Sequence, residues 1–192
     1  MKKKMCIADF DKTLITVDSL VHIMFHEAWL FSPKIIICCL VIVILKITGK
    51  DTAKVRSLLK EQMLKHYYAL PASKKDKYIR FFQTRLNGSV IDHITSAKPD
   101  IVVVVSASEE SLIGDVLGNT LGDVSIIANN LSGNKIFETC WGKNKAKRLK
   151  SEYTHLSDYI IITYTDSYSD QSLIDISQEA WMVKGKDVSK IK

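Results

Sequence analysis

Two runs of β-branched residues constrain the fold of this chain more than any other feature. Residues 102–105 are four consecutive valines, and residues 159–163 read Tyr-Ile-Ile-Ile-Thr. Short apolar runs of this kind are typical of strands that are buried on both faces of a parallel sheet. Further apolar runs at 5–8, 123–127 and 180–183 predict additional strands. The pattern therefore predicts an α/β fold with a Rossmann-like parallel sheet.

The segment between residues 18 and 98 has helical periodicity and almost no strand signal. Four helices are expected there, over residues 18–30, 33–48, 51–68 and 73–87. A chain of 192 residues is long enough for one large core but too short for two. We therefore expect a core made of residues 1–17 and 99–192. Residues 18–98 would be a helical cap, inserted after the first strand and hanging over the carboxyl edge of the sheet.

Two carboxylates, Asp9 and Asp11, directly follow the first predicted strand, and Thr13 lies close behind them. The carboxyl ends of the strands are where open α/β sheets bind their ligands. Two acids one residue apart repel each other unless a cation lies between them. Mg²⁺, a hard cation that prefers oxygen ligands, is the usual choice when the substrate brings phosphate. The motif therefore predicts phosphoryl chemistry.

Three further groups follow in an order that supports this interpretation. Ser106 directly follows the valine strand and is predicted to be the N-cap of a helix that runs to about residue 117. At the start of this helix, the Ser106 hydroxyl and the helix N–H groups could hold phosphate oxygens. Lys145 opens another helical pattern and could place a positive charge on the phosphoryl group. Asp166 and Asp170 follow the 159–163 strand and could complete a metal site. Residues 129–134 are turn material that could close a small hairpin.

With these motifs in place, the chain resembles the haloacid dehalogenase-like hydrolase superfamily. The resemblance extends from residue 5 to residue 173. It is closest to the branch with a helical cap after the first strand (subfamily IB), which includes phosphoserine phosphatase and phosphatidylglycerophosphatase C type enzymes. The resemblance implies a phosphatase, or phosphoric monoester hydrolase, that depends on Mg²⁺ and works through an aspartyl-phosphate intermediate.

The resemblance also implies a role for each motif residue. Asp9 corresponds to the nucleophile, and Asp11 to the general acid and base that also offers its backbone carbonyl to Mg²⁺. The implied phosphate-binding residues are Thr13, Ser106 and Lys145. The implied metal ligands are Asp9, Asp11 and Asp166, with Asp170 in a supporting position.

The chain departs from the family pattern at three places. Thr165 stands where relatives usually carry glycine, and a side chain there could shift Asp166 and reduce activity. Lys143 is the alternative to Lys145 as the phosphate-neutralising lysine. Asp18 stands where phosphoserine phosphatases carry a glutamate, which disfavours phosphoserine as the substrate, and Asp18 also reads as a helix N-cap.

The composition limits the partners and the compartment. The net charge of +6 is spread over scattered lysines, consistent with a solvated basic surface or with attraction of an anionic substrate or membrane. No nucleic-acid motif is present, and the aromatic residues are not interleaved with the basic clusters, so nucleic acid is not an expected partner. The four cysteines have no C-x-x-C spacing, which favours a reducing cytoplasm.

The run from Ile35 to Leu45 is apolar on all sides and bounded by Lys34 and Lys46. It is about half the length that a membrane span needs. A helix that is apolar all round must be buried by protein, by a partner chain or by lipid. The run therefore predicts a buried cap helix, a dimer contact or a membrane-docking helix.

The main hypothesis is a cytoplasmic Mg²⁺-dependent phosphomonoesterase that acts on a small phosphorylated metabolite. Two alternatives remain open. One is a lipid-phosphate phosphatase of the phosphatidylglycerophosphatase C type, peripheral to the inner face of the membrane through residues 35–45. The other is a non-catalytic binding module that keeps the fold but has lost turnover through the change at Thr165. The oligomeric state is not indicated by the sequence.

Overall fold

The structure is a computed structural model, and it describes residues 2–131 and 139–192. Within these residues, one six-stranded sheet has the order β3-β2-β1-β4-β5-β6, and only β6 runs antiparallel to its neighbour. The strands are β1 (Lys3–Ala8), β2 (Ile101–Glu109), β3 (Val124–Asn129), β4 (Tyr159–Thr165), β5 (Glu179–Lys184) and β6 (Asp187–Lys190). The predicted α/β fold with a largely parallel sheet is confirmed.

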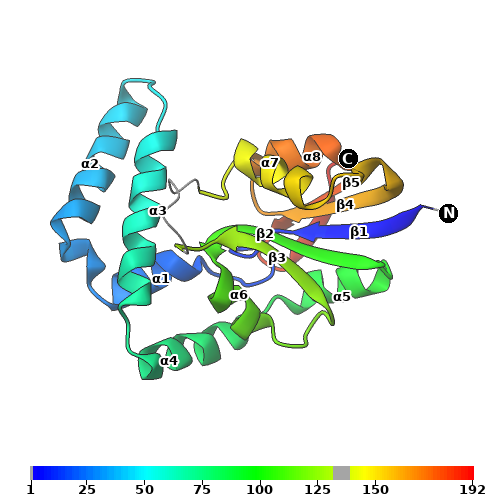
Figure 1. Cartoon of the computed structure of the whole chain (residues 1–192), viewed down its shortest axis with the longest axis horizontal. Helices are drawn as coiled ribbons and strands as arrows, with labels where there is room; N and C mark the ends of the chain where they lie inside the picture. The colour runs from blue at the N-terminus through cyan, green and yellow to red at the C-terminus, as the bar shows by residue number, and fades with distance from the viewer. Residues whose placement is uncertain (1, 132–138) are drawn as a thin grey trace.

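Both faces of the sheet are buried, as the β-branched runs predicted. Along β1, Met5 and Ile7 contact one hydrophobic cluster, whereas Cys6 and Ala8 contact the other. The helices α7 (Lys143–Glu152) and α8 (Gln171–Ile176) cover the first face, and α5 (Gly88–Ser96) and α6 (Glu110–Leu117) lie on the second (Figure 1). Alternate side chains of a strand point to opposite faces, so a strand between two helix layers must be apolar throughout.

The predicted helical insertion between β1 and β2 is confirmed. It begins with α1 (Ser19–His26), the short 3-10 helix η1 (Trp29–Phe31), α2 (Pro33–Ile47) and α3 (Ala53–Tyr68), and continues with α4 (Ala72–Gln83) and α5. The antiparallel pair α2 and α3 stands beside the carboxyl edge of the sheet (Figure 1). This pair therefore faces the strand ends that carry the predicted catalytic residues.

Two helices of the insertion differ from the prediction. The helix expected over 18–30 ends at His26, because the chain turns at Ala28 with a φ of 56° before η1 begins. The helix expected over 73–87 ends at Gln83, and α5 follows as a further helix that the sequence pattern did not indicate. His93 of α5 contacts the Tyr164 hydroxyl at 3.0 Å and packs against the Trp181 ring, so α5 lies against β4 and β5.

The strand β2 is longer than predicted. Ser106 lies inside β2, and α6 begins only at Glu110, where the Glu109 side chain accepts a hydrogen bond from the Leu112 N–H at 2.6 Å. The predicted N-cap role of Ser106 is therefore wrong, because Glu109 caps this helix. Asn129 is the last residue of β3. Residues 132–134 of the predicted turn lie outside the described residues.

The helix α2 is the outermost helix of the insertion (Figure 1). It packs against α3 and η1, and Ile35 is the single buried residue among its fifteen. The predicted buried cap helix is therefore wrong, and a partner chain or lipid remains as the expected cover for its apolar surface. No helix within residues 2–131 and 139–192 is long and apolar enough to cross a membrane.

Candidate active site

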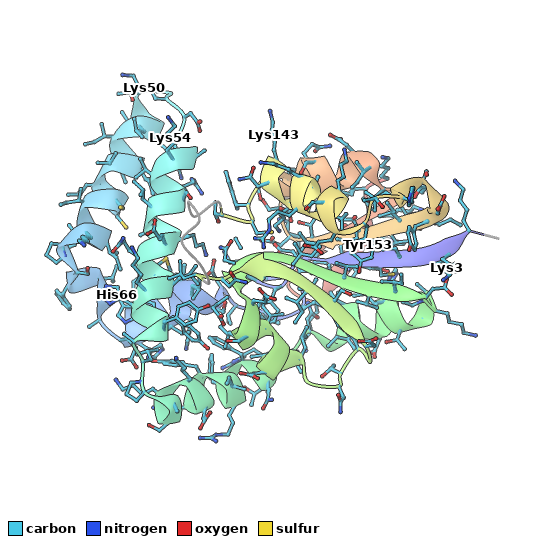
Figure 2. All side chains as sticks on the ribbon, in the orientation of Figure 1. Lys3, Lys50, Lys54, His66, Lys143 and Tyr153 are labelled. Carbon is cyan, nitrogen blue, oxygen red and sulfur yellow. The ribbon has the colours of Figure 1, made fainter. Side chains whose placement is uncertain are left out.

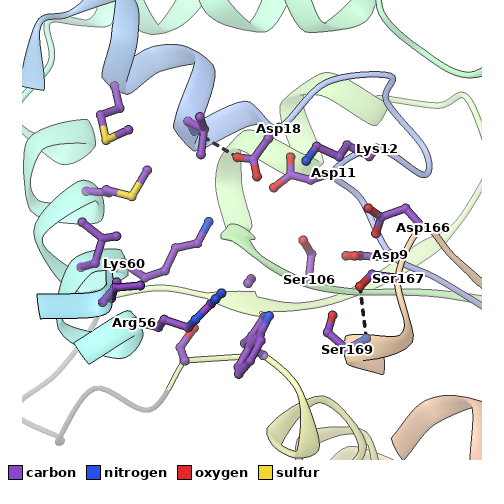
Figure 3. Close-up of a pocket in the computed structure, with 18 of the residues that line it drawn as sticks. Asp9, Asp11, Lys12, Asp18, Arg56, Lys60, Ser106, Asp166, Ser167 and Ser169 are labelled. Carbon is purple, nitrogen blue, oxygen red and sulfur yellow. Dashed lines mark hydrogen bonds between the residues drawn. The ribbon is translucent and has the colours of Figure 1, made fainter. Parts of the chain in front are cut away.

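A pocket of about 510 Å³ opens between the carboxyl ends of the central strands and the helices α1, α2 and α3. Of the predicted site residues, it brings together five: Asp9, Asp11, Ser106, Lys145 and Asp166. Figure 3 shows Asp9, Asp11, Ser106 and Asp166 on the core side of this pocket. Residues separated by more than 150 positions in the sequence therefore meet at one edge of the sheet, as the motif order predicted.

Asp9 is held rigidly at the end of β1. Its N–H donates to the Tyr164 carbonyl at 3.0 Å, which continues the pairing of β1 with β4. Its Oδ1 accepts a hydrogen bond from the Phe10 N–H at 2.8 Å and lies 3.0 Å from Lys145 Nζ. These contacts fix the orientation of the carboxylate toward the pocket before any ligand arrives.

Lys145 is buried between two carboxylates. Its Nζ donates to Asp170 Oδ2 at 2.7 Å and lies 3.0 Å from Asp9 Oδ1. Burial alone would lower the pKa of this ammonium, but Asp9 and Asp170 outweigh that effect and raise it. Lys143, the alternative from the sequence, is exposed at the start of α7. The structure therefore brings Lys145, and not Lys143, into the pocket beside Asp9.

Asp11 is held by two residues that the sequence analysis missed. Ser108 Oγ donates to Asp11 Oδ2 at 2.5 Å, and the Ser19 N–H donates to Asp11 Oδ1 at 2.8 Å. The two serine hydroxyls also contact each other at 2.8 Å. Burial, followed by the nearby Asp18 carboxylate, raises the pKa of Asp11 to about 7. A carboxyl group with this pKa can exist in both protonation states near neutral pH.

The two hydroxyl residues predicted to hold phosphate lie in different environments. Ser106 lines the pocket, and its Oγ accepts a hydrogen bond from the Ser108 N–H at 3.2 Å. Thr13 is fully buried and is not among the pocket-lining residues. Its hydroxyl has no hydrogen-bond partner among the residues that the structure describes. The structure thus brings Ser106, and not Thr13, to the pocket surface.

Asp166 and Asp9 both line the pocket, and their carboxylates influence each other. Burial, followed by the charge of Asp9, raises the pKa of Asp166. Across residues 2–131 and 139–192, no three acidic, histidine or cysteine side chains are grouped closely enough to hold a metal ion by themselves. The two carboxylates are nevertheless hard oxygen donors that repel each other, and a divalent cation between them would reduce that repulsion. The residues present therefore fit a hard cation such as Mg²⁺.

Thr165 is hydrogen-bonded to residues that follow it in the chain. Its hydroxyl lies 2.8 Å from Asp170 Oδ2 and 3.1 Å from the Ser167 carbonyl, and the Ser167 N–H donates to it at 3.2 Å. Thr165 is the last residue of β4 and has an extended backbone, so a residue with a Cβ fits there. The threonine adds a hydrogen bond to the carboxylate that supports Lys145.

The opposite wall of the pocket comes from the helical insertion. Two cationic residues of α3, Arg56 and Lys60, extend from this wall toward the core side (Figure 3). The Arg56 guanidinium lies 5.1 Å from the centre of the Trp141 ring. The apolar lining residues on this wall are Val21, Met24, Cys39, Ile42, Val43, Leu59 and Met63. This wall could contact a substrate with both anionic and apolar parts.

Asp18 combines two roles. It caps α1 as predicted, since its Oδ1 accepts a hydrogen bond from the Val21 N–H at 3.0 Å, and it also lines the pocket.

Lys12, which the sequence analysis did not single out, lines the pocket as well and has a φ of 58°. A left-handed conformation at a residue other than glycine is strained, and such strain concentrates at functional sites.

The comparison with protein families identifies the class of this protein. Residues 6–175 match the family model described as haloacid dehalogenase-like hydrolase. This match covers most of the chain, and the chain therefore belongs to the haloacid dehalogenase-like hydrolases, with a helical cap after the first strand. No curated protein is significantly similar to the chain.

Solved structures support the same fold at low sequence identity. A protein of unknown function from Bordetella pertussis Tohama I is 14% identical, with a TM-score of 0.66 over 94% of this chain and 89% of that chain. A phosphoserine phosphatase in complex with its substrate is 19% identical, with a TM-score of 0.57 over 94% and 85%. A phospho-aspartyl intermediate analogue of phosphoserine phosphatase is also 19% identical, with a TM-score of 0.54 over 94% and 86%.

Proposed function

We propose that this protein is a Mg²⁺-dependent phosphatase that hydrolyses phosphate monoesters through an aspartyl-phosphate on Asp9. The observation that carries the proposal is the placement of the Asp9 carboxylate at the end of β1, 3.0 Å from the buried Lys145 ammonium and in one pocket with Ser106. A carboxylate is a weak nucleophile in water, but it can attack phosphorus when the phosphate charge is neutralised.

The proposed reaction has two displacements at phosphorus. In the first, Asp9 Oδ2 attacks the phosphorus, because Oδ1 is already held by the Phe10 N–H and Lys145. The bond from phosphorus to the ester oxygen breaks, and Asp11 gives that oxygen a proton. In the second, Asp11 takes a proton from a water molecule whose oxygen attacks the phosphorus and releases Asp9 and inorganic phosphate. The raised pKa of Asp11, about 7, supports this exchange of one proton.

The chain supplies suitable groups around these steps. Ser106 would hold a phosphate oxygen, Lys145 would neutralise charge on the phosphoryl group, and Asp170 would keep Lys145 in place. The carboxylates of Asp9 and Asp166, with the Asp11 backbone carbonyl expected from the family resemblance, would hold Mg²⁺. The bound cation would supply positive charge that lowers the repulsion between Asp9 and the substrate phosphate.

The substrate is proposed to be a small phosphorylated metabolite. A solved neighbour is a phosphoserine phosphatase with its substrate bound, which supports a phosphate monoester in general. The second candidate is a lipid phosphate. The apolar residues of α2 and α3 favour it, because they line the pocket opposite the acids together with Arg56 and Lys60. A phosphorylated amphiphile would place its phosphate at Asp9, and its apolar part would lie against the insertion.

The test is turnover of a generic aryl phosphate by the wild type and the Asp9→Asn variant. Asp9→Asn should lose several orders of magnitude in rate while keeping the fold, because the nucleophile is removed. Asp123→Asn is the matched control, since Asp123 is exposed just before β3, at the opposite end of the sheet. Near-wild-type activity in Asp9→Asn would overturn the nucleophile assignment. No turnover of aryl, sugar, amino-acid, nucleotide or lipid phosphates by the wild type would instead favour a non-catalytic binding module.

A further inference from the structure

The outer face of α2 is a large exposed apolar surface. Its exposed residues are 41% to 79% accessible, and we call them the α2 stripe: Ile36, Ile37, Leu40, Val43, Ile44 and Ile47. Phe31, in the adjoining helix η1, is 82% accessible. Single exposed apolar residues are ordinary on soluble proteins, but a contiguous group of this size marks a site of interaction.

The α2 stripe forms one continuous face of the helix. Its members follow the spacing i, i+1, i+4, i+7, i+8 and i+11, which places them on one side of a helix with 3.6 residues per turn. The other side of α2 faces the protein, where Ile35 is buried and Cys39 packs against the core cluster. The stripe therefore lies on the side of α2 that Ile35 and Cys39 do not occupy.

The charged residues in the segment 33–50, which contains α2, are all positive. Lys34 near the start of α2, Lys46 in its last turn and Lys50 just beyond it are exposed. No acidic residue occurs in the sequence between Glu27 and Asp51. Figure 2 shows Lys50 and Lys54 at the free end of the α2–α3 pair. An apolar helix face flanked by lysines complements a bilayer with an apolar interior and acidic head groups.

We propose that the α2 stripe docks on the surface of an anionic lipid bilayer, with α2 lying parallel to the membrane plane. The same charges disfavour a second copy of the chain as the occupant. An antiparallel pair of α2 helices would bring Lys34 of one copy toward Lys46 of the other, and neither helix carries an acidic residue to neutralise them.

Docking would place the pocket beside the membrane. Val43 belongs to the α2 stripe and also lines the pocket, and Cys39 and Ile42 on the same helix line it too. A docked α2 would therefore bring the pocket mouth next to the lipid head groups. The docking does not depend on the proposed phosphatase activity, but it would give that activity access to phosphorylated molecules at the bilayer surface.

The test is co-sedimentation of the full chain with two kinds of vesicle, phosphatidylcholine alone and phosphatidylcholine mixed with phosphatidylglycerol. The wild type should pellet with the mixed vesicles and much less with the neutral ones, and added salt should weaken its binding. The double variant Leu40→Glu, Ile44→Glu should reduce partitioning by at least about tenfold, because it places two charges in the apolar face.

The matched control is Leu58→Glu. Leu58 lies on α3 outside the stripe and is 52% accessible, close to the 58% of Leu40, so the same substitution at similar exposure should leave vesicle binding unchanged. Circular dichroism and thermal unfolding would show that all variants are folded. Binding is measured without turnover, and Asp9→Asn protein should bind as the wild type does, so a failed activity assay and a failed docking assay are separate results.

Three results would overturn the proposal. The wild type could fail to pellet with either vesicle. The stripe variant and the Leu58 control could bind equally well. Light scattering could show that the wild type is a dimer, that the double variant is a monomer, and that neither binds vesicles. This result would assign the stripe to contact with a second copy of the chain.

Discussion

At the scale of single residues, the site depends on a buried lysine between two acids. Lys145 is 2% accessible, and it contacts Asp9 and Asp170 directly. Both carboxylates depend on this one shared cation, because an unpaired charge away from water is costly. The lysine that is proposed to neutralise the substrate phosphate therefore also keeps the two carboxylates together in the absence of substrate.

Replacing Lys145 should affect activity and stability together. Lys145→Gln leaves Asp9 and Asp170 without their shared cation, so we expect a loss of several orders of magnitude in kcat/KM and a drop of roughly 3–5 kcal/mol in the free energy of unfolding. Kinetics and denaturant unfolding measure the two effects. Lys143→Gln, two residues earlier and exposed, should change neither. A larger effect at Lys143 than at Lys145 would reverse the assignment of the two lysines.

Thr165 gives a second prediction at this scale. Thr165→Val keeps the shape but removes the hydroxyl that lies 2.8 Å from Asp170 Oδ2. The variant should lose about 1–3 kcal/mol of stability, since Asp170 is buried and loses a hydrogen-bond donor. Thr165→Ser retains the hydroxyl and should restore most of this loss in thermal or denaturant unfolding. Equal stability of the valine variant and the wild type would show that the hydroxyl does not support Asp170.

Sequence reasoning identified candidate catalytic residues that the structure brings together in the pocket, but not all of the residues that hold them. Asp9, Asp11, Lys145 and Asp166 could be predicted because each follows a strand or begins a helix in a recognisable order. Ser108 was missed, because the helix was expected to start at Ser106 and the extra strand residues of β2 were not foreseen. Their alternation places Ser106 and Ser108 on the same side of β2, which was the signal that could have identified Ser108.

At the scale of elements, α1 and α4 are joined by a polar contact as well as by packing. Glu27, directly after α1, accepts hydrogen bonds from Lys74 Nζ at 2.5 Å and from the Tyr78 hydroxyl at 2.7 Å. Both donors belong to α4. The hydrogen bonds from Lys74 and Tyr78 lower the pKa of Glu27 below its ordinary value.

This lowered pKa predicts a pH dependence of stability. The ionised Glu27 stabilises the folded chain above its unfolded pKa of about 4.3, and that contribution disappears as the pH falls through the lower folded pKa. The difference in unfolding free energy between the wild type and Glu27→Gln should therefore be largest near neutral pH and shrink below pH 4. Asp76→Asn, an exposed change on α4, should show little difference at any pH. A difference that grew toward acid pH would contradict the argument.

The elements differ in how well sequence could predict them. The strands were predicted because short, continuous β-branched runs are typical of buried strands in a parallel sheet. The helix α5 was missed because it is short and because Gly88, Val90 and Thr95 weaken its helical signal. Its packing on β4 and β5 stabilises it in the folded chain. The composition of α2 predicted that it needs a cover, but only the structure showed that its outer face is exposed.

At the scale of the whole molecule, the sheet carries the candidate catalytic residues at its carboxyl edge, and the insertion forms the opposite wall of the pocket. We propose that residues 1–17 and 99–192 form the core and residues 18–98 the cap, with α5 of the cap packed against the sheet. Because the pocket lies between these two parts, we expect α1, α2 and α3 to determine which substrate binds and the residues at the strand ends to carry out the proposed chemistry.

Metal removal tests whether the proposed activity requires a cation bound by the carboxylates at the strand ends. Excess chelator should abolish phosphatase activity, and added Mg²⁺ should restore it, because Lys145 alone would not offset the repulsion between Asp9, Asp166 and the substrate phosphate. Ca²⁺ should restore little, since its larger and looser coordination would misplace the nucleophile. Steady-state turnover measures all three conditions. Full activity in excess chelator would contradict the proposed metal dependence.

The central claim is that phosphate passes through Asp9 and is not transferred directly to water. The stereochemical course at phosphorus tests it most directly, with a phosphorothioate monoester made chiral by oxygen isotopes and hydrolysed in isotopically labelled water. Each in-line displacement inverts the configuration, so two displacements through Asp9 predict overall retention. Inversion would mean a single displacement by water, and it would contradict the account.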